Sequence, residues 1–158
     1  MIARFNRMVV GLFFFGATLG AISCAPKASP ASAPIPVGAP LYKRLGGYDA
    51  IAAVTDQFLG RVAADTALAP FFAGLKEPEM QRIRQMVVDQ VCFATGGPCF
   101  YVGKSMKESH VTLDITNAIF DRFVGHLQTT LVAFAVPSRE QNELLGALGT
   151  MRADIVTK

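Results

Sequence analysis

The sequence predicts an all-α domain that follows an N-terminal targeting segment. From Leu41 onward, apolar residues recur at intervals of three, four and seven, the spacing of an amphipathic helix. No stretch alternates apolar and polar residues over the length of a strand. Glycine and proline separate the apolar stripes, so the folded part divides into four main helices.

Residues 1–23 have the organisation of a secretory signal. Two arginines precede the apolar run 8–19, and small residues follow it. A membrane-anchoring helix is the alternative interpretation, but this run is shorter than the roughly 20 residues that a spanning helix needs. Ala21-Ile22-Ser23-Cys24 resembles the bacterial lipoprotein box, in which the cysteine receives a lipid, although Ala21-x-Ser23 also fits ordinary signal peptidase. We therefore expect export to the periplasmic side of a bacterial membrane, with lipid anchoring at Cys24.

Residues 24–40 are typical of a tether. The stretch 25–40 contains five prolines, and most of its other residues are Ala, Ser, Gly or Val. It has no amphipathic period and too little apolar bulk for a core, so a semi-extended linker is expected. The folded domain is therefore predicted to span 41–158.

Four apolar stripes mark the helices of this domain. The first stripe is followed by Pro70, and the second is ended by Thr95-Gly96-Gly97-Pro98. The third helix is capped by Thr116 or Asn117, and the fourth begins at Pro137-Ser138. The stripes are Ile51, Val54, Phe58 and Val62; Met80, Ile83, Val87 and Val91; Ile119, Phe123, Leu127 and Leu131; and Leu144, Leu148, Met151 and Ile155.

The stretch 97–116 has no strong period and at most a turn or two of helix, at 106–110. Long irregular connections in compact domains are often functional. One of the two histidines, His110, lies here and is a candidate ligand, although many imidazoles only form hydrogen bonds. His126, on the polar side of the third helix, is assigned to hydrogen bonding.

Composition and motifs exclude several classes of protein. The 158 residues include 15 Lys+Arg and 12 Asp+Glu, 51% apolar residues and 17% charged ones, which is typical of a folded chain. Without residues 1–23 the net charge falls from +3 to +1, so the composition does not support a nucleic-acid partner. Gly-x-Ser-x-Gly, His-Glu-x-x-His and a phosphate-binding loop are missing, and no residues have the spacing of a zinc site.

The three cysteines favour one disulfide. Cys92 ends the second helix, and the Gly-Gly-Pro turn can return Cys99 to its side. If Cys24 carries a lipid, one pair is left, and an oxidising compartment would oxidise it. Two unpaired core thiols are the alternative.

Several short motifs, weak individually, together resemble the group I truncated haemoglobins. Their order and most of their spacings match across nearly all of 41–158. The resemblance implies a two-over-two sandwich of helices around haem b. The motifs are Leu41-Tyr42-Lys43-Arg44-Leu45-Gly46-Gly47; Asp65 with Ala69-Pro70-Phe71-Phe72; Gly96-Gly97-Pro98 with Tyr101-x-Gly103; and Met106-Lys107 with His110, Ile115 and Thr116.

The resemblance implies roles for individual residues. His110 matches the proximal ligand of the haem iron, and Phe72 matches the aromatic residue that stacks on the haem face. The iron would bind O2, NO or CO, and a reductase, not identifiable from the sequence, would be a partner. The remaining residues implied to contact the cofactor on these sides are Tyr101, Ile115, Phe120, Val124 and Leu131.

The chain departs from the resemblance on the ligand side. Group I members usually place Tyr on the first long helix, where Leu59 stands here, and Gln on the next helix. The matching positions on that next helix are Ile83, Met86 and Val87, and Met86 replaces a basic residue that often pairs with a haem propionate. Gln90, one turn beyond Val87, is the nearest polar residue and is expected to point past the ligand.

An apolar ligand side would bind O2 weakly, because the ligand would lack a hydrogen bond. Two other functions are alternatives. One is a haem enzyme with peroxidase-like or NO-converting activity, although no distal acid–base residue is evident. The other is a haem-free helical lipoprotein that acts as a binding module.

Overall fold

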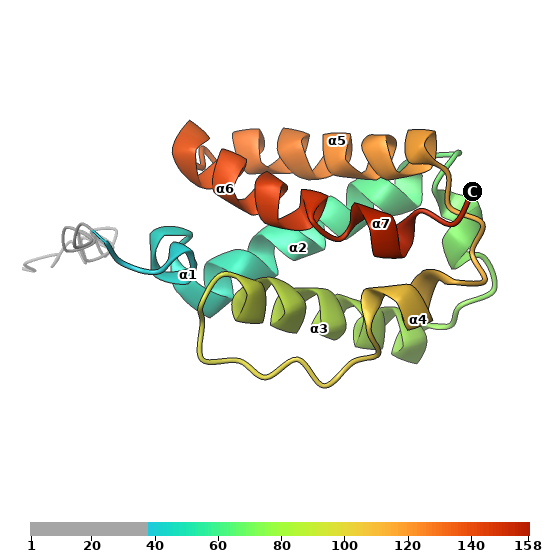
Figure 1. The fold of residues 1–158 in the computed structure, drawn as a ribbon, viewed down its shortest axis with the longest axis horizontal. Coiled ribbons are helices and arrows are strands. Elements are labelled where there is room, and N and C mark those ends of the chain that lie inside the picture. The colour runs from blue at the N-terminus through green and yellow to red at the C-terminus, as the bar shows by residue number, and fades with distance from the viewer. Residues whose placement is uncertain (1–37) are drawn as a thin grey trace, which may run out of the picture. The chain divides into compact units, whose positions relative to one another are not determined.

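The computed structural model describes residues 38–158, which form an all-helical domain (Figure 1). The predicted signal 1–23, the lipidation site Cys24 and most of the linker 24–40 lie outside the described residues. Within 38–158, no helix has both the length and the hydropathy needed to span a membrane. The elements are α1 (Leu41–Arg44), α2 (Gly47–Ala64), the 3-10 helix η1 (Ala69–Phe72), α3 (Glu77–Ala94), α4 (Met106–His110), α5 (Asn117–Ala133), α6 (Ser138–Gly149) and α7 (Arg152–Ile155).

The four long helices form two pairs. Helix α2 packs against α3 and also against α5, and α5 packs against α6. In Figure 1, α5 and α6 run along the top, α2 crosses below them, and α3 and α4 lie along the lower edge. The prediction of an all-α fold with four main helices is confirmed.

Apolar side chains from both pairs meet in two clusters. Phe58, Val62 and Leu68 form one, and the ring of Phe58 meets that of Phe123 edge to face, with 4.7 Å between centroids. This geometry places the positive edge of one ring against the negative face of the other. The second cluster joins three residues from the C-terminal half: Ile115, Phe120 and Ile155.

The predicted fourth helix is two helices. Helix α6 ends at Gly149, and α7 begins at Arg152. At the break, the Met151 amide bonds to Leu148 O at 3.0 Å, three residues back, which tightens the last turn. After the break, α7 packs against α4. The apolar period continues across positions 149–152, so it does not reveal the interruption.

Asp65, at the end of α2, ties this helix to α5. Its Oδ2 accepts hydrogen bonds from Nε of Arg122 and Nε2 of His126, both at 2.5 Å, and its Oδ1 accepts one from the Ala67 amide at 2.8 Å. Arg122, and after it His126, hold the pKa of the Asp65 carboxyl well below its usual range. His126 therefore forms the kind of structural hydrogen bond that the sequence predicted.

Candidate functional site

A cavity of about 500 Å³ lies among the helices, with side chains from α2, α3, α4, α5, α6 and α7 on its walls. This volume falls within the range of small-molecule and cofactor pockets. The lining is mostly apolar, and its charged side chains are Arg82 and Lys104. An interior of this kind suits a large apolar ligand that carries a few charged groups.

The structure brings together nearly all of the predicted site residues. They come from segments up to about 70 positions apart in sequence, and they share this one cavity. The predicted residues that line it are Leu59, Phe72, Ile83, Met86, Val87, Gln90, Tyr101, His110, Ile115, Phe120 and Leu131.

Val124 is the exception, because it is not among the residues that line the cavity. It packs instead against the cluster of Ile115, Phe120 and Ile155. Its neighbour Phe123 does line the cavity, and successive residues on a helix point about 100° apart. The three residues of this cluster line the cavity themselves, so Val124 supports its wall from behind, and a contact of Val124 with haem stays a prediction.

His110 ends helix α4 at the cavity wall. Its Nδ1 lies 2.7 Å from Met106 O, one turn earlier on the same helix. A carbonyl oxygen can only accept a hydrogen bond, so Nδ1 carries the proton and Nε2 of the neutral ring keeps its lone pair. An imidazole held by such a bond is oriented as metal-ligating histidines are. No cluster of three or more His, Cys, Asp or Glu suited to a metal occurs within 38–158.

Local hydrogen bonds hold α4 in place. Ser105 caps the helix, since its Oγ accepts from the Glu108 amide at 3.2 Å and its own amide donates to Glu108 Oε2 at 3.0 Å. These bonds to Ser105 lower the pKa of Glu108. After the helix, Ile115 exchanges hydrogen bonds with Thr157: its amide donates to Thr157 Oγ1 at 3.0 Å, and its carbonyl accepts from the Thr157 amide at 2.9 Å. The segment that carries His110 is therefore fixed at both ends.

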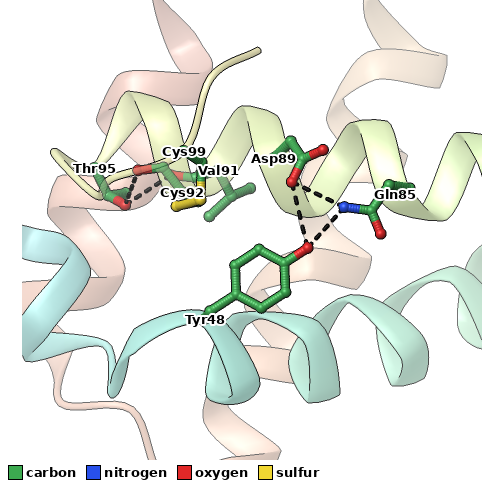
Figure 2. Close-up of a disulfide and its surroundings, with 7 residues drawn as sticks. All are labelled: Tyr48, Gln85, Asp89, Val91, Cys92, Thr95 and Cys99. Atoms are coloured by element: carbon green, nitrogen blue, oxygen red, sulfur yellow. Dashed lines mark hydrogen bonds between the residues drawn. A yellow bond between two sulfur atoms is a disulfide. The ribbon is translucent and has the colours of Figure 1, made fainter. Parts of the chain in front are cut away.

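A disulfide between Cys92 and Cys99 joins the end of α3 to the loop that leads to α4 (Figure 2). The two Cα atoms are 5.8 Å apart, a usual separation for a disulfide, and the predicted pairing is confirmed. Gly97 lies inside this turn, where a Cβ would come within 2.6 Å of Cys92 Sγ and 2.5 Å of the Tyr42 ring. The turn therefore requires glycine at this position.

Beside the disulfide, a polar cluster links α2 to α3 outside the cavity. Figure 2 shows Tyr48 of α2 reaching Gln85 and Asp89 of α3. Gln85 Nε2 donates to the Tyr48 hydroxyl at 2.7 Å and to Asp89 Oδ1 at 2.9 Å. Gln85 and Asp89 lie on the side of α3 that forms hydrogen bonds with Tyr48. Ile83, Val87 and Gln90, on other positions of the same helix, line the cavity.

The loop after the disulfide supplies one edge of the cavity. The Tyr101 ring folds over Gly103, where a Cβ would lie 2.4 Å from the ring, and its hydroxyl donates to Lys104 O at 2.9 Å. Partial burial raises the pKa of this tyrosine. Sequence reasoning missed Lys104 and Arg82 as lining residues. Arg82 lies one turn before Met86 and therefore on the same face of α3, and this spacing could have identified it as a lining residue.

The wall that α2 and α3 contribute, here called the α2–α3 wall, is less apolar than predicted. Leu59, Ile83, Val87 and Gln90 line it, the four residues expected on the ligand side. The direction of the Gln90 side chain relative to a bound ligand stays a prediction. Sequence reasoning did not consider Thr55, which lies one turn before Leu59 and is 3% exposed. Its helical spacing to Leu59 could have identified it.

Comparisons with known proteins agree with this architecture. The chain matches the family model for bacterial-like globins over residues 40–157. Group 1 truncated haemoglobin GlbN of Mycolicibacterium paratuberculosis is 37% identical over 131 residues, which is 83% of this chain and 88% of that protein. This chain belongs to the group 1 truncated haemoglobins of the bacterial-like globin family.

Solved structures show the same fold. The Fe(III) form of truncated haemoglobin from Tetrahymena pyriformis superposes with a TM-score of 0.71 at 29% identity, over 76% of this chain and all of that one. The two-over-two haemoglobin of Synechococcus sp. PCC 7002, which has a covalently attached haem, gives 0.69 at 28% identity over the same shares. The predicted two-over-two sandwich is confirmed, so α2, α3, α5 and α6 are the two helix pairs of a truncated globin.

Proposed function

We propose that this truncated globin binds haem b in its cavity, with His110 as the protein ligand of the iron, and that the haem binds a diatomic gas. The observation that carries the proposal is the hydrogen bond from His110 Nδ1 to Met106 O at the cavity wall. It leaves Nε2 with a lone pair, which is what an iron ligand needs. When bound, the haem supplies a ferrous iron that can take up O2, NO or CO.

The other lining residues fit the remaining parts of a haem. Phe72 offers a ring to stack on the porphyrin, and Ile115, Phe120 and Leu131 offer apolar surface. Arg82 and Lys104 can pair with the two propionate carboxylates. We infer that they replace the basic residue missing at Met86. The mostly apolar walls would limit the access of water to a bound haem.

A visible spectrum of the purified protein, recorded in the ferric, ferrous and ferrous-CO states, tests the proposal. We expect one haem per chain, and we expect His110→Ala to lose stoichiometric haem because the protein–iron bond is gone. His126→Ala is the matched control, since His126 bonds to Asp65 away from the cavity and should leave the haem content unchanged. Unchanged haem content and an unchanged ferrous-CO Soret band in His110→Ala would refute the assignment. A colourless wild type would favour a haem-free binding module.

We further infer that the protein is exported and anchored by a lipid at Cys24, on the periplasmic side of a bacterial membrane. The basic and apolar pattern of 1–23, followed by Ala21-Ile22-Ser23-Cys24, supports this inference. The Cys92–Cys99 disulfide supports it as well, because disulfides persist mainly in oxidising compartments. With the proline-rich stretch as spacer, the globin domain would be held at the membrane surface. An unidentified reductase there would keep the haem ferrous.

A further inference from the structure

Thr55 is a buried polar residue on the α2–α3 wall. It is 3% exposed and borders the cavity beside Leu59 and Val87. The residues that flank it on the same side of α2, Ile51 and Phe58, are apolar and equally buried. A hydroxyl in such surroundings costs free energy unless it has a hydrogen-bond partner.

The hydroxyl of Thr55 lacks the partner that a helical threonine usually takes. Such a hydroxyl normally donates to the carbonyl four residues earlier. Thr129 and Thr130 on α5 do so, at 2.9 and 2.8 Å, and Thr95 at the end of α3 does so at 2.6 Å. Within 38–158, the side-chain hydrogen bonds of α2 come from Tyr48 and Asp56, and the Thr55 hydroxyl forms none, not even to Ile51 O.

The free hydroxyl of Thr55 borders the cavity. Within the described chain, the one fully enclosed side-chain polar atom without a partner is Nε of Arg61. The Thr55 oxygen is not enclosed in this way, so it touches open space. Since Thr55 is almost completely shielded from the outside, the open space is that of the cavity.

We propose that Thr55 is the hydrogen-bond donor to the gas ligand, which makes it a selectivity-determining residue of this globin. The inference rests on the proposed haem binding. A hydroxyl that donates a hydrogen bond stabilises a bound ligand that carries partial negative charge. Bound O2 carries such charge, whereas bound CO carries little, so the donor raises the affinity for O2 relative to CO. With Leu59 at the position where relatives carry Tyr, Thr55 supplies a hydroxyl from one turn earlier on the same helix.

Gln90 is the rival donor on the same wall. Gln90 also lines the cavity, and its side chain takes no part in the side-chain hydrogen bonds that α3 forms within 38–158. Thr55 is the better assignment because it is only 3% exposed, whereas Gln90 is partly buried and has a longer side chain with more rotamer freedom to lose. The two hypotheses predict different mutant phenotypes.

The test compares haem-loaded wild type with Thr55→Val, Thr55→Ser and Gln90→Leu. Valine keeps the shape of threonine without its hydroxyl, and serine keeps the hydroxyl. Haem content, the infrared C–O stretch of the ferrous-CO form, and O2 and CO release by stopped flow are measured for each protein. Thr55→Val should speed O2 release about three- to tenfold, the factor for one neutral hydrogen bond. It should also raise the C–O stretching frequency and change CO release less than twofold.

Thr55→Ser should remain close to wild type in both O2 release and C–O stretch. If Thr55→Val binds haem but leaves both quantities unchanged, the assignment of Thr55 is overturned. If Gln90→Leu alone changes them, Gln90 is the donor and the inference is equally overturned. A wild type that takes up no haem overturns the proposed function, and this inference with it.

Discussion

Breaking the Cys92–Cys99 disulfide should destabilise the domain by an amount that follows from its loop length. The bridge closes a loop of eight residues, since its cysteines are seven positions apart. In the chain-entropy model, a loop of this size restricts the unfolded chain by about 8 cal/mol/K, or about 2.5 kcal/mol at 25 °C. For a domain of this size, that corresponds to a fall in Tm of roughly 8–15 °C.

Cys99→Ala is the suitable variant, because Cys92 is completely buried and its removal would also leave a hole in the core. A Cys24→Ser background leaves Cys92 and Cys99 as the remaining cysteines. Urea denaturation followed by circular dichroism gives the free energy of unfolding, with and without reductant. Thiol titration of denatured, unreduced protein should find no free thiol in the parent and one in Cys99→Ala.

The control is the response of each protein to reductant. Reductant should lower the stability of the parent by about 2.5 kcal/mol and leave Cys99→Ala unchanged. A loss below about 0.5 kcal/mol in Cys99→Ala would refute the chain-entropy reasoning, provided that the parent is fully oxidised. If reductant lowers the stability of both proteins equally, its effect does not come from breaking the Cys92–Cys99 disulfide.

Three further predictions concern the ligand side, the membrane anchor and acid stability. Leu59→Tyr adds a hydroxyl to the α2–α3 wall and should slow O2 release about ten- to a hundredfold, the equivalent of about 1–3 kcal/mol. CO release should change much less. Stopped-flow O2 release rates equal to those of wild type would contradict this prediction. Protein expressed with its signal should label with palmitate and partition into detergent, and Cys24→Ser should abolish both; a label that survives would exclude Cys24 as the acceptor. Arg122 and His126 lower the pKa of Asp65 in the folded protein. The ionised carboxylate therefore stabilises the fold at pH values above the pKa of an unfolded aspartate, near 3.9. This contribution is lost as the pH falls through the lower pKa that Asp65 has in the folded state. Asp65→Asn should therefore reduce stability at pH 7 and flatten its decline below about pH 4, whereas parallel pH profiles in urea denaturation would reject this role.

Much of the site was predictable because its signals are local in sequence. The apolar period located the four long helices, since burial of one helix face repeats every three to four residues. The turn Gly96-Gly97-Pro98 predicted that Cys99 returns to Cys92, because a tight turn brings nearby residues together. His110 stood out as one of only two histidines, in a segment without strong periodicity.

The direction of individual side chains was less predictable. Val124 packs behind Ile115, Phe120 and Ile155, which line the cavity themselves. Gln90 borders the cavity, but whether it points past a bound ligand stays a prediction. Such directions depend on the rotation of a helix about its axis, which its packing against other helices decides.

The sequence by itself predicted an all-α domain with one candidate ligand histidine and one cysteine pair suited to a disulfide, because period, turn and residue type are encoded over a few neighbouring positions. Only the tertiary structure decided which polar groups face the cavity and which have partners. Arg82 and Lys104 line the cavity, and the Thr55 hydroxyl has no partner among the side-chain hydrogen bonds of α2, because hydrogen bonds and burial depend on segments far apart in the chain. The chemistry of the ligand side therefore depends on how α2 packs against α3, and no local pattern specifies that packing.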